Sequence, residues 1–237
     1  MIQTIFETLD ATWPAAKFSS VGNWTIRQGA KGGQRVSAAT ANGPVTSADI
    51  NVAEQAMQAL DQPPLFMIRP DEEPLAALLM DKGYYVHDPV NAYLCPIETL
   101  SRIAPDRMSA FSVWPPLAII NVIWADQGIN PHRQAVMQRA NGPKTAILAR
   151  QNDRPAGVAY VAIHNKTAML HALEVVYDQR WQGVANNIVG RAALWAQDNG
   201  ATSFSVVCVR ENHAANALYT SLNMENVGYY HYMKKDP

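Results

Sequence analysis

The sequence is poor in cysteine. Only Cys95 and Cys208 occur in 237 residues, which is too few for a disulfide framework, and no Cys-x-x-Cys or Cys/His spacing typical of a metal site is present. Both cysteines lie in apolar, strand-like stretches, so we expect two buried thiols. The cysteine content therefore predicts neither a disulfide scaffold nor a bound metal.

An excess of one charge is also missing. Lys and Arg together number 19 and Asp and Glu number 20, and no run of like charge occurs, which argues against a nucleic-acid-binding surface. No stretch of about 18 apolar residues could span a membrane, and the first residues lack the pattern of a secretory signal. We expect a cytoplasmic protein without a nucleic-acid or membrane partner.

Apolar residues, at 48% of the chain, are sufficient for a sizeable core. The C-terminal part shows a helical pattern over 117–140 with a break at Asn130-Pro131, and then a regular order of strands and helices. Short polar links between its first three strands predict antiparallel hairpins. These strands are expected at 144–150, 155–163 and 167–176, followed by a helix over 183–199, a strand over 204–209, a helix over 214–222 and a strand over 227–233. The pattern predicts a mixed α/β fold with a mostly antiparallel sheet flanked by helices.

The N-terminal half repeats part of this order in a shorter form. A strand over 65–69, a helix and Gly83-Tyr84 mirror the strand over 204–209, the following helix and Asn223-Met224. We therefore expect a degenerate repeat, with an N-terminal lobe over 1–104 and a catalytic domain over 105–237. The glycine-rich stretch 29–33 lies between two expected strands, 24–27 and 35–41, and is interpreted as a hairpin turn.

One loop has the features of an anion site. The stretch 175–185 leaves an expected strand, turns, and opens a helix at Gly183 and Ala185. Free N–H groups at a helix N-terminus bind anions, and glycine lets the backbone approach a phosphate. Arg180 would supply a further donor. The candidate loop consists of Arg180, Trp181, Gln182, Gly183, Val184 and Ala185.

A second motif follows about thirty residues later, at the start of the helix expected over 214–222. It consists of Asn212, Ala215, Leu218 and Tyr219. Taken together, the two motifs resemble the GCN5-related N-acetyltransferase (GNAT) superfamily, whose signatures are Arg/Gln-x-x-Gly-x-Gly/Ala and Asn-x-x-Ala-x-x-Leu-Tyr. The resemblance covers residues 110–237. The chain departs from the family at Tyr177 (usually Pro), at Asn223-Met224 (usually Gly-Phe) and at the polar pair Asn186-Asn187.

The resemblance implies a GNAT fold that uses acetyl-CoA and no metal. It implies that the backbone of Val175 and Val176 pairs with the pantetheine arm and that residues 180–185 hold the pyrophosphate. Asn212 would contact the cofactor arm, and Tyr219 would protonate the departing thiolate. Members of this family often dimerise, so a homodimer is an expectation.

The base that deprotonates the acceptor amine remains open between two residues. His171 has a suitable ordinary pKa and lies in a stretch resembling that of arylalkylamine N-acetyltransferases, while Glu174 lies near the end of the same strand. Alternation of side chains puts them on opposite faces, unless a β-bulge intervenes. A third alternative is that neither acts. Cys208 lies near enough to be considered for a covalent intermediate, although direct attack is preferred.

The leading hypothesis is acetyl transfer from acetyl-CoA to a primary amine, on a small molecule or on a peptide or protein. One alternative is an acyl-CoA sensor or regulatory protein without turnover, and another is a transferase for longer acyl-CoA. Trp114, Trp124 and Trp181 could line the site, but aromatic residues at such spacing more often belong to a core.

Overall fold

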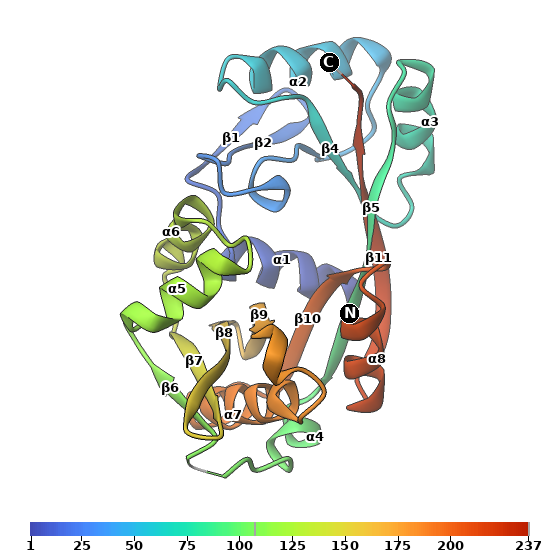
Figure 1. Cartoon of the computed structure of the whole chain (residues 1–237). Coiled ribbons are helices and arrows are strands. Elements are labelled where there is room, and N and C mark those ends of the chain that lie inside the picture. Colours follow the sequence, from blue (N-terminus) through green and yellow to red (C-terminus); the bar gives the residue numbers. More distant parts are fainter. Residues whose placement is uncertain (107, 237) are drawn as a thin grey trace.

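The computed structural model describes residues 1–106 and 108–236 and is built around a sheet of eight strands (Figure 1). The strand order in this sheet is β4-β11-β5-β10-β9-β8-β7-β6, and β1, β2 and β3 form a second, three-stranded sheet. The N-terminal elements are α1 (Ile2–Thr12), β1 (Lys17–Val21), β2 (Trp24–Gln28), a 3₁₀ turn (Gln34–Val36), β3 (Thr40–Ala41), α2 (Ser47–Gln58), β4 (Leu65–Ile68), α3 (Glu73–Asp81) and β5 (Tyr85–Pro96).

The C-terminal elements are α4 (Ile97–Ser101), β6 (Ala110–Val113), α5 (Ala118–Asp126), α6 (Pro131–Arg139), β7 (Lys144–Gln151), β8 (Arg154–His164), β9 (Thr167–Val175), a 3₁₀ turn (Tyr177–Gln179), α7 (Val184–Asp198), β10 (Ser203–Val209), α8 (His213–Ser221) and β11 (Glu225–Lys234). From α5 onward the C-terminal elements follow the order expected from the sequence, whereas α4 and β6 were not predicted. The mixed, mostly antiparallel sheet flanked by helices is thereby confirmed.

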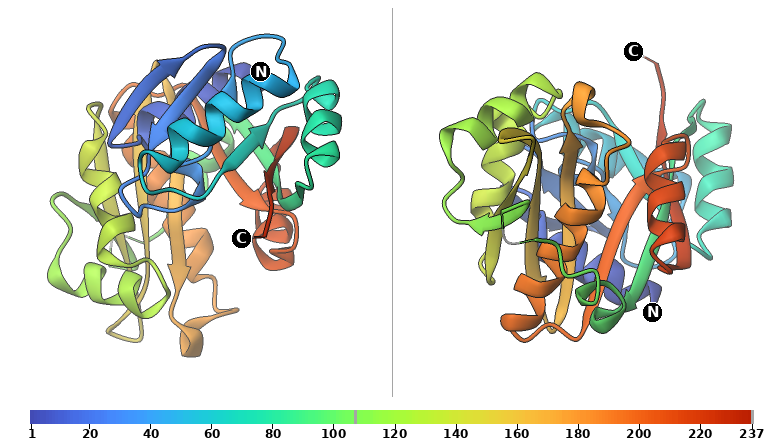
Figure 2. Two further views of the ribbon diagram at one scale, coloured as in Figure 1. Left: turned by 90° about the horizontal axis from the view of Figure 1, so that it is seen from above. Right: turned by 60° about the horizontal axis from the view of Figure 1, so that its bottom comes forward.

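Two apolar cores cover the two faces of the strands β7, β8 and β9. On one face α7 packs its buried stripe, including Ile188 and Ala192, against Ile147 and Val161. On the other face α5 and α6 pack with Trp13, just after α1, against a core that includes Tyr160. Alternate residues of one strand therefore serve different cores, as the period of a β-strand requires. Figure 2 shows α7 and the α5–α6 pair on opposite sides of the sheet.

The N-terminal strands are interleaved with the C-terminal ones. β5 lies between β10 and β11 and pairs antiparallel with both, and β11 in turn lies between β5 and β4. The units β4-α3-β5 and β10-α8-β11 correspond, and α3 and α8 each have nine residues. The first strand of each unit pairs in parallel with a residue or strand that comes before it in the chain. In the first unit Phe66 of β4 forms a single parallel bridge with Ala39, and in the second unit β10 pairs in parallel with β9. The order of elements is thus the same in the two units, and the degenerate repeat stays a prediction.

The stretch 29–41 differs from the sequence expectation. Residues 35–41 were expected to form one strand, but Arg35 lies in a 3₁₀ turn and only Thr40–Ala41 pairs with β2. The glycine-rich stretch is a wide loop that packs against α6. A Cβ at Gly32 would lie 2.6 Å from Cγ2 of Val136, so a side chain there would push α6 away. The stretch does connect two antiparallel strands, β2 and β3, but the expected strand over 35–41 is reduced to Thr40–Ala41 because residues 34–36 form a 3₁₀ turn.

Candidate active site

The parallel strands β9 and β10 diverge where the site would lie. Their pairing runs from Thr167 with Ser203 to Leu170 with Val206 and ends there. β9 continues to Val175 and β10 to Val209, so both strands have free edges beyond this point. The divergence can be followed in Figure 2. Unpaired N–H and C=O groups on such edges are available to an extended ligand.

A β-bulge on β9 decides which way the two candidate bases point. His171 is opposite Tyr160 of β8 and Glu174 is opposite Val158, so three steps on β9 match two steps on β8. The extra residue, Ala172, has a φ of 52°, and its carbonyl accepts a 2.9 Å hydrogen bond from Nε1 of Trp124. The bulge puts His171 and Glu174 on the same face of the sheet.

His171 is buried in a complete set of contacts. Its Nε2 lies 2.8 Å from Oγ1 of Thr12, and that hydroxyl donates to the carbonyl of Thr8. The hydroxyl therefore accepts from Nε2–H, which leaves Nδ1 to accept from Nη1 of Arg35 at 3.1 Å. Burial lowers the pKa of His171 well below 6.5, and the charge of Arg35 lowers it further. The imidazole is held neutral with both nitrogens engaged.

Glu174 has a different environment. Its side chain is half-buried near the end of β9. Burial raises the pKa of Glu174, while the charges of Arg180 and Arg133 oppose this rise. A carboxylate with a raised pKa is a stronger proton acceptor than an ordinary surface glutamate.

The loop before α7 has the geometry of a helix-start anion site. Gly183 is the N-cap residue with a φ of 82°, a left-handed conformation that favours glycine. A Cβ added at Gly183 would meet no atom within 4 Å, so the space in front of the helix is open. Val184 is buried in the core and Ala185 half-buried, so both offer backbone N–H groups here. Trp181 is 93% exposed, and Gln182 donates to the carbonyl of Asp178 at 3.0 Å.

Arg180 reaches back to the free edge of β9. Its Nε donates to the carbonyl of Val175 at 3.2 Å, and its guanidinium lies over the ring of Tyr177. The N–H of Val176 pairs with the carbonyl of Ala156 on β8. The Val175 carbonyl therefore points away from β8, into the divergence of β9 and β10, where the sequence predicts the pantetheine arm.

The second motif places its residues at the start and on the buried side of α8. Asn212 is the N-cap, and its Oδ1 accepts from the N–H of Ala215 at 3.1 Å. Tyr219 is 4% exposed, and its ring lies 5.7 Å from that of Tyr93. Burial raises the pKa of Tyr219, and the neighbouring Cys208 and Glu174 raise it further. The phenol therefore remains a proton donor at neutral pH.

Cys208 does not have the environment of a nucleophile. Burial raises the pKa of its thiol to about 11, against a smaller opposing effect of Arg35. A thiol in this state carries almost no thiolate at neutral pH. The environment of this thiol therefore favours the direct-attack hypothesis over a covalent intermediate.

Asn216 was not singled out from the sequence, although it connects several parts of this site. Its Oδ1 accepts from Tyr93 at 2.8 Å and from Asn91 at 2.9 Å, both on β5. Its Nδ2 donates to the carbonyl of Val209 at the end of β10. The only sequence signal was a second asparagine one turn after Asn212. Its partners on β5 are far away in the chain, so local pattern could not reveal them.

The three tryptophans considered as lining residues differ in position. Trp124 is fully buried beneath the bulge, and Trp114 packs on Tyr160 in the same core. Only Trp181 is open to solvent, beside the anion loop. The interpretation as core residues therefore holds for the first two.

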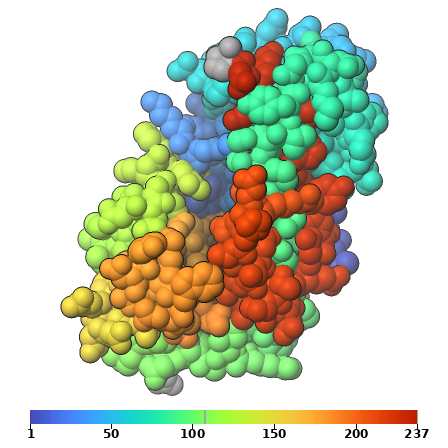
Figure 3. Space-filling model, turned by 45° about the vertical axis from the view of Figure 1, so that its right-hand side comes forward, coloured from blue at the N-terminus to red at the C-terminus, as the bar shows by residue number. Residues whose placement is uncertain are grey.

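The surface of the molecule has a hollow on one face. Figure 3 shows a hollow between the α5–α6 region, the connection from β9 to α7, and α8, with part of the N-terminal segment at its floor. Segments from both halves of the chain therefore border this hollow.

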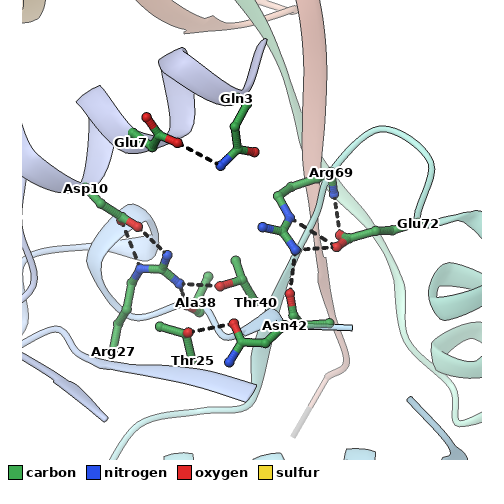
Figure 4. A network of polar contacts seen from close by, with 11 residues as sticks. Gln3, Glu7, Asp10, Thr25, Arg27, Ala38, Thr40, Asn42, Arg69 and Glu72 are labelled. Atoms are coloured by element: carbon green, nitrogen blue, oxygen red, sulfur yellow. Dashed lines mark hydrogen bonds and ion pairs between the residues drawn. The ribbon is translucent and has the colours of Figure 1, made fainter. Parts of the chain in front are cut away.

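A separate polar cavity lies between α1, β2, β3 and β4 (Figure 4). Arg27 is buried there and paired with Asp10 at 2.7 Å, and it also donates to Thr40 at 3.0 Å. Arg69 is paired with Glu72 at 2.6 Å. Both arginines have their carboxylate partners within the protein, so this network satisfies itself and contributes to the fold.

Comparison with known proteins agrees with this geometry. Residues 111–224 match the Acetyltransferase (GNAT) family. The chain carries a GNAT domain. It is 22% identical over 245 residues to a Bacillus subtilis protein described as the uncharacterized N-acetyltransferase YobR, a match that covers 99% of this chain and 98% of that protein.

Two solved structures share their fold with nearly the whole of this chain. A GCN5-related N-acetyltransferase from Kribbella flavida has a TM-score of 0.71 at 16% identity, covering 99% of this chain and 95% of that one. A conserved protein of unknown function from Staphylococcus epidermidis ATCC 12228 has a TM-score of 0.73 at 15% identity, covering 96% and 97%. At these identities the likeness shows the fold alone.

Two further observations concern the described residues. No group of three or more His, Cys, Asp or Glu residues among them is arranged to hold a metal ion. Within the same residues, no helix has both the length and the apolar character needed to cross a membrane.

Proposed function

We propose that this GNAT protein transfers an acetyl group from acetyl-CoA to a primary amine by direct attack. The observation that carries the proposal is the divergence of β9 and β10 between the anion loop at Gly183 and the buried phenol of Tyr219. The free edge of β9 at Val175 suits the amides of a pantetheine arm, and the open start of α7 suits a pyrophosphate. Arg180 must then release the Val175 carbonyl and turn toward the phosphates.

Glu174 is the proposed base. The protonated amine loses one proton to Glu174, directly or through water, and its nitrogen then attacks the thioester carbonyl. The C–N bond forms as the C–S bond breaks, and Tyr219 gives its proton to the leaving thiolate. The second proton that the nitrogen loses after the attack restores the phenol of Tyr219. We assign His171 a positioning role, because Arg35 and Thr12 already engage both of its nitrogens.

The chain is further proposed to consist of two interlocked lobes, over 1–104 and 105–237. In the N-terminal unit, Leu79 on α3 stands seven residues after Glu72 before the helix, as Tyr219 on α8 stands seven residues after Asn212. The N-terminal lobe therefore lacks a phenol at the corresponding position. Its proposed role is to form the floor of the groove in the catalytic lobe.

Two measurements test the proposed activity. Isothermal titration with acetyl-CoA is expected to show binding, and a CoA-release assay over a panel of amines is expected to show turnover for at least one class. Tight binding without release for any amine would instead favour a sensor. Absence of acetyl-CoA binding would overturn the assignment of the site.

A further inference from the structure

Arg35 and Arg133 reach the groove from different parts of the chain. Arg35 lies in the 3₁₀ turn that follows β2, and Arg133 lies in the first turn of α6. Nε of Arg133 is 3.9 Å from the position that a Cβ would take at Gly33, two residues before Arg35. Arg35 in turn lies 3.1 Å from Nδ1 of His171 and stacks over Trp13. Arg133 therefore lies beside the loop that carries Arg35, and the guanidinium group of Arg35 contacts His171 on β9.

These two cations lack an acidic partner within the described residues. The ion pairs found there give Arg27 and Arg69 a carboxylate within 4 Å, but none joins Arg35 or Arg133. Desolvation by the surrounding groove lowers the pKa of Arg133, although the side chain remains accessible, and the charge of Arg35 lowers it further. Two like charges in a partly desolvated groove cost free energy that a bound anion would offset.

The pair lies on the acceptor side of the proposed chemistry. The negative charge of Glu174 opposes the fall in the pKa of Arg133, and the positive charge of Arg133 opposes the rise in the pKa of Glu174. The two side chains therefore interact electrostatically without forming an ion pair. Arg35 holds the ring of His171, which shares a face of β9 with Glu174. An amine next to Glu174 would thus have the two guanidinium groups within the reach of a small molecule.

We propose that the acceptor is a small amine that also carries a carboxylate, as an amino acid does, with Arg35 and Arg133 binding the carboxylate while Glu174 faces the amine. This inference rests on the proposed acetyltransferase function and adds the class of substrate to it. Arginine suits the role because its planar N–H donors match the two oxygens of a carboxylate. Arg35 uses one donor for His171 and retains others for a ligand.

The test compares amino acids with neutral counterparts of the same shape. The twenty amino acids are assayed beside their amides and, where these exist, their decarboxylated amines, with CoA release as the readout. We expect kcat/KM for the best amino acid to exceed that of its amide by about tenfold or more, as for the loss of a charged hydrogen-bonded pair. In Arg133→Gln this ratio is expected to fall toward one, and Arg133→Lys should restore part of it. Arg154→Gln, exposed at the start of β8, is the matched control and should keep the ratio.

Binding is measured separately from turnover, so that the two proposals can fail separately. Titration of the best amino acid into wild type and Arg133→Gln, with CoA present, is expected to show an affinity lower by about tenfold in the variant. Such a difference without turnover would retain the carboxylate site and overturn the transferase proposal. Equal kcat/KM and equal binding for amino acids and their amides would overturn the inference, as would variants that leave the preference intact. Circular dichroism confirms that each variant is folded.

Discussion

Nη1 of Arg35 lies 3.1 Å from Nδ1 of His171, so a side chain of the N-terminal segment fixes the ring that sequence pattern favoured as the base. Thr12, at the end of α1, engages the other nitrogen. A histidine with a guanidinium on its free lone pair is poorly placed to accept a proton, since the resulting cation would face another cation. The contact between Arg35 and His171 therefore favours Glu174 as the base.

The first prediction concerns stability and pH. Burial lowers the pKa of His171 in the folded protein. Below about pH 6.5 the unfolded chain therefore binds a proton at this histidine that the folded chain does not bind. The free energy of unfolding should therefore fall as pH decreases below 6.5, by up to about 1.4 kcal/mol per pH unit from this group. His171→Gln should remove this contribution. Urea unfolding at pH 7.5, 6.5 and 5.5 measures it.

His164→Gln, at the last residue of β8, is the matched control for this experiment and should keep the wild-type pH dependence. Parallel curves for His171→Gln and wild type would show that His171 is not held neutral in the folded protein.

The second prediction separates the two candidate bases. Glu174 must be ionised to accept a proton, and burial raises its pKa above 4.5. The profile of kcat/KM against pH should therefore have a rising limb above pH 4.5 that reports the ionisation of Glu174. Glu174→Gln should abolish this limb and lower kcat/KM by about 100-fold. His171→Gln should keep the limb. Loss of the limb in His171→Gln with its retention in Glu174→Gln would reverse the assignment.

The third prediction tests the proton donor. Tyr219→Phe removes the phenolic hydroxyl from a side chain that is 4% exposed and leaves its packing on Tyr93 in place. We expect kcat to fall by about 10- to 100-fold, because the thiolate then leaves without a proton donor, while acetyl-CoA affinity changes little. Tyr84→Phe loses a hydrogen bond to Glu54 far from the site and is the control. An unchanged kcat in Tyr219→Phe would exclude the phenol as the acid.

The fourth prediction tests the anion loop. Gly183→Val puts a branched side chain into the open space before α7 and strains a residue whose φ is 82°. Acetyl-CoA affinity, measured by titration calorimetry, should fall by about tenfold or more, since a branched Cβ replaces the closest approach of a phosphate.

Gly200→Val is the control for backbone strain. Gly200 follows the other end of α7, has a φ of 86° and also faces open space. Each variant should lose about 1–2 kcal/mol of stability through strain, but only Gly183→Val should lose affinity. Equal affinities in the two variants would disprove the phosphate role of the loop.

The sequence determined the local part of this protein. The order of elements from 117 to 233 followed from apolar periodicity and from turns such as Asn152-Asp153, whose residue types tolerate the positive φ that they adopt. Gly183 and Tyr219 were recognisable because a helix start and a helix face are set by neighbours within a few residues. These features need no distant contact to form.

Only the tertiary structure decided the rest, because it depends on residues far apart in the chain. The bulge at Ala172, which puts His171 and Glu174 on one face, is held by Trp124, 48 residues earlier. The insertion of β5 between β10 and β11 follows from hydrogen bonding across the sheet, which local periodicity does not predict. Arg133 lies beside the loop before Arg35 because Gly32 lets α6 pack closely against that loop, about 100 residues away in the chain.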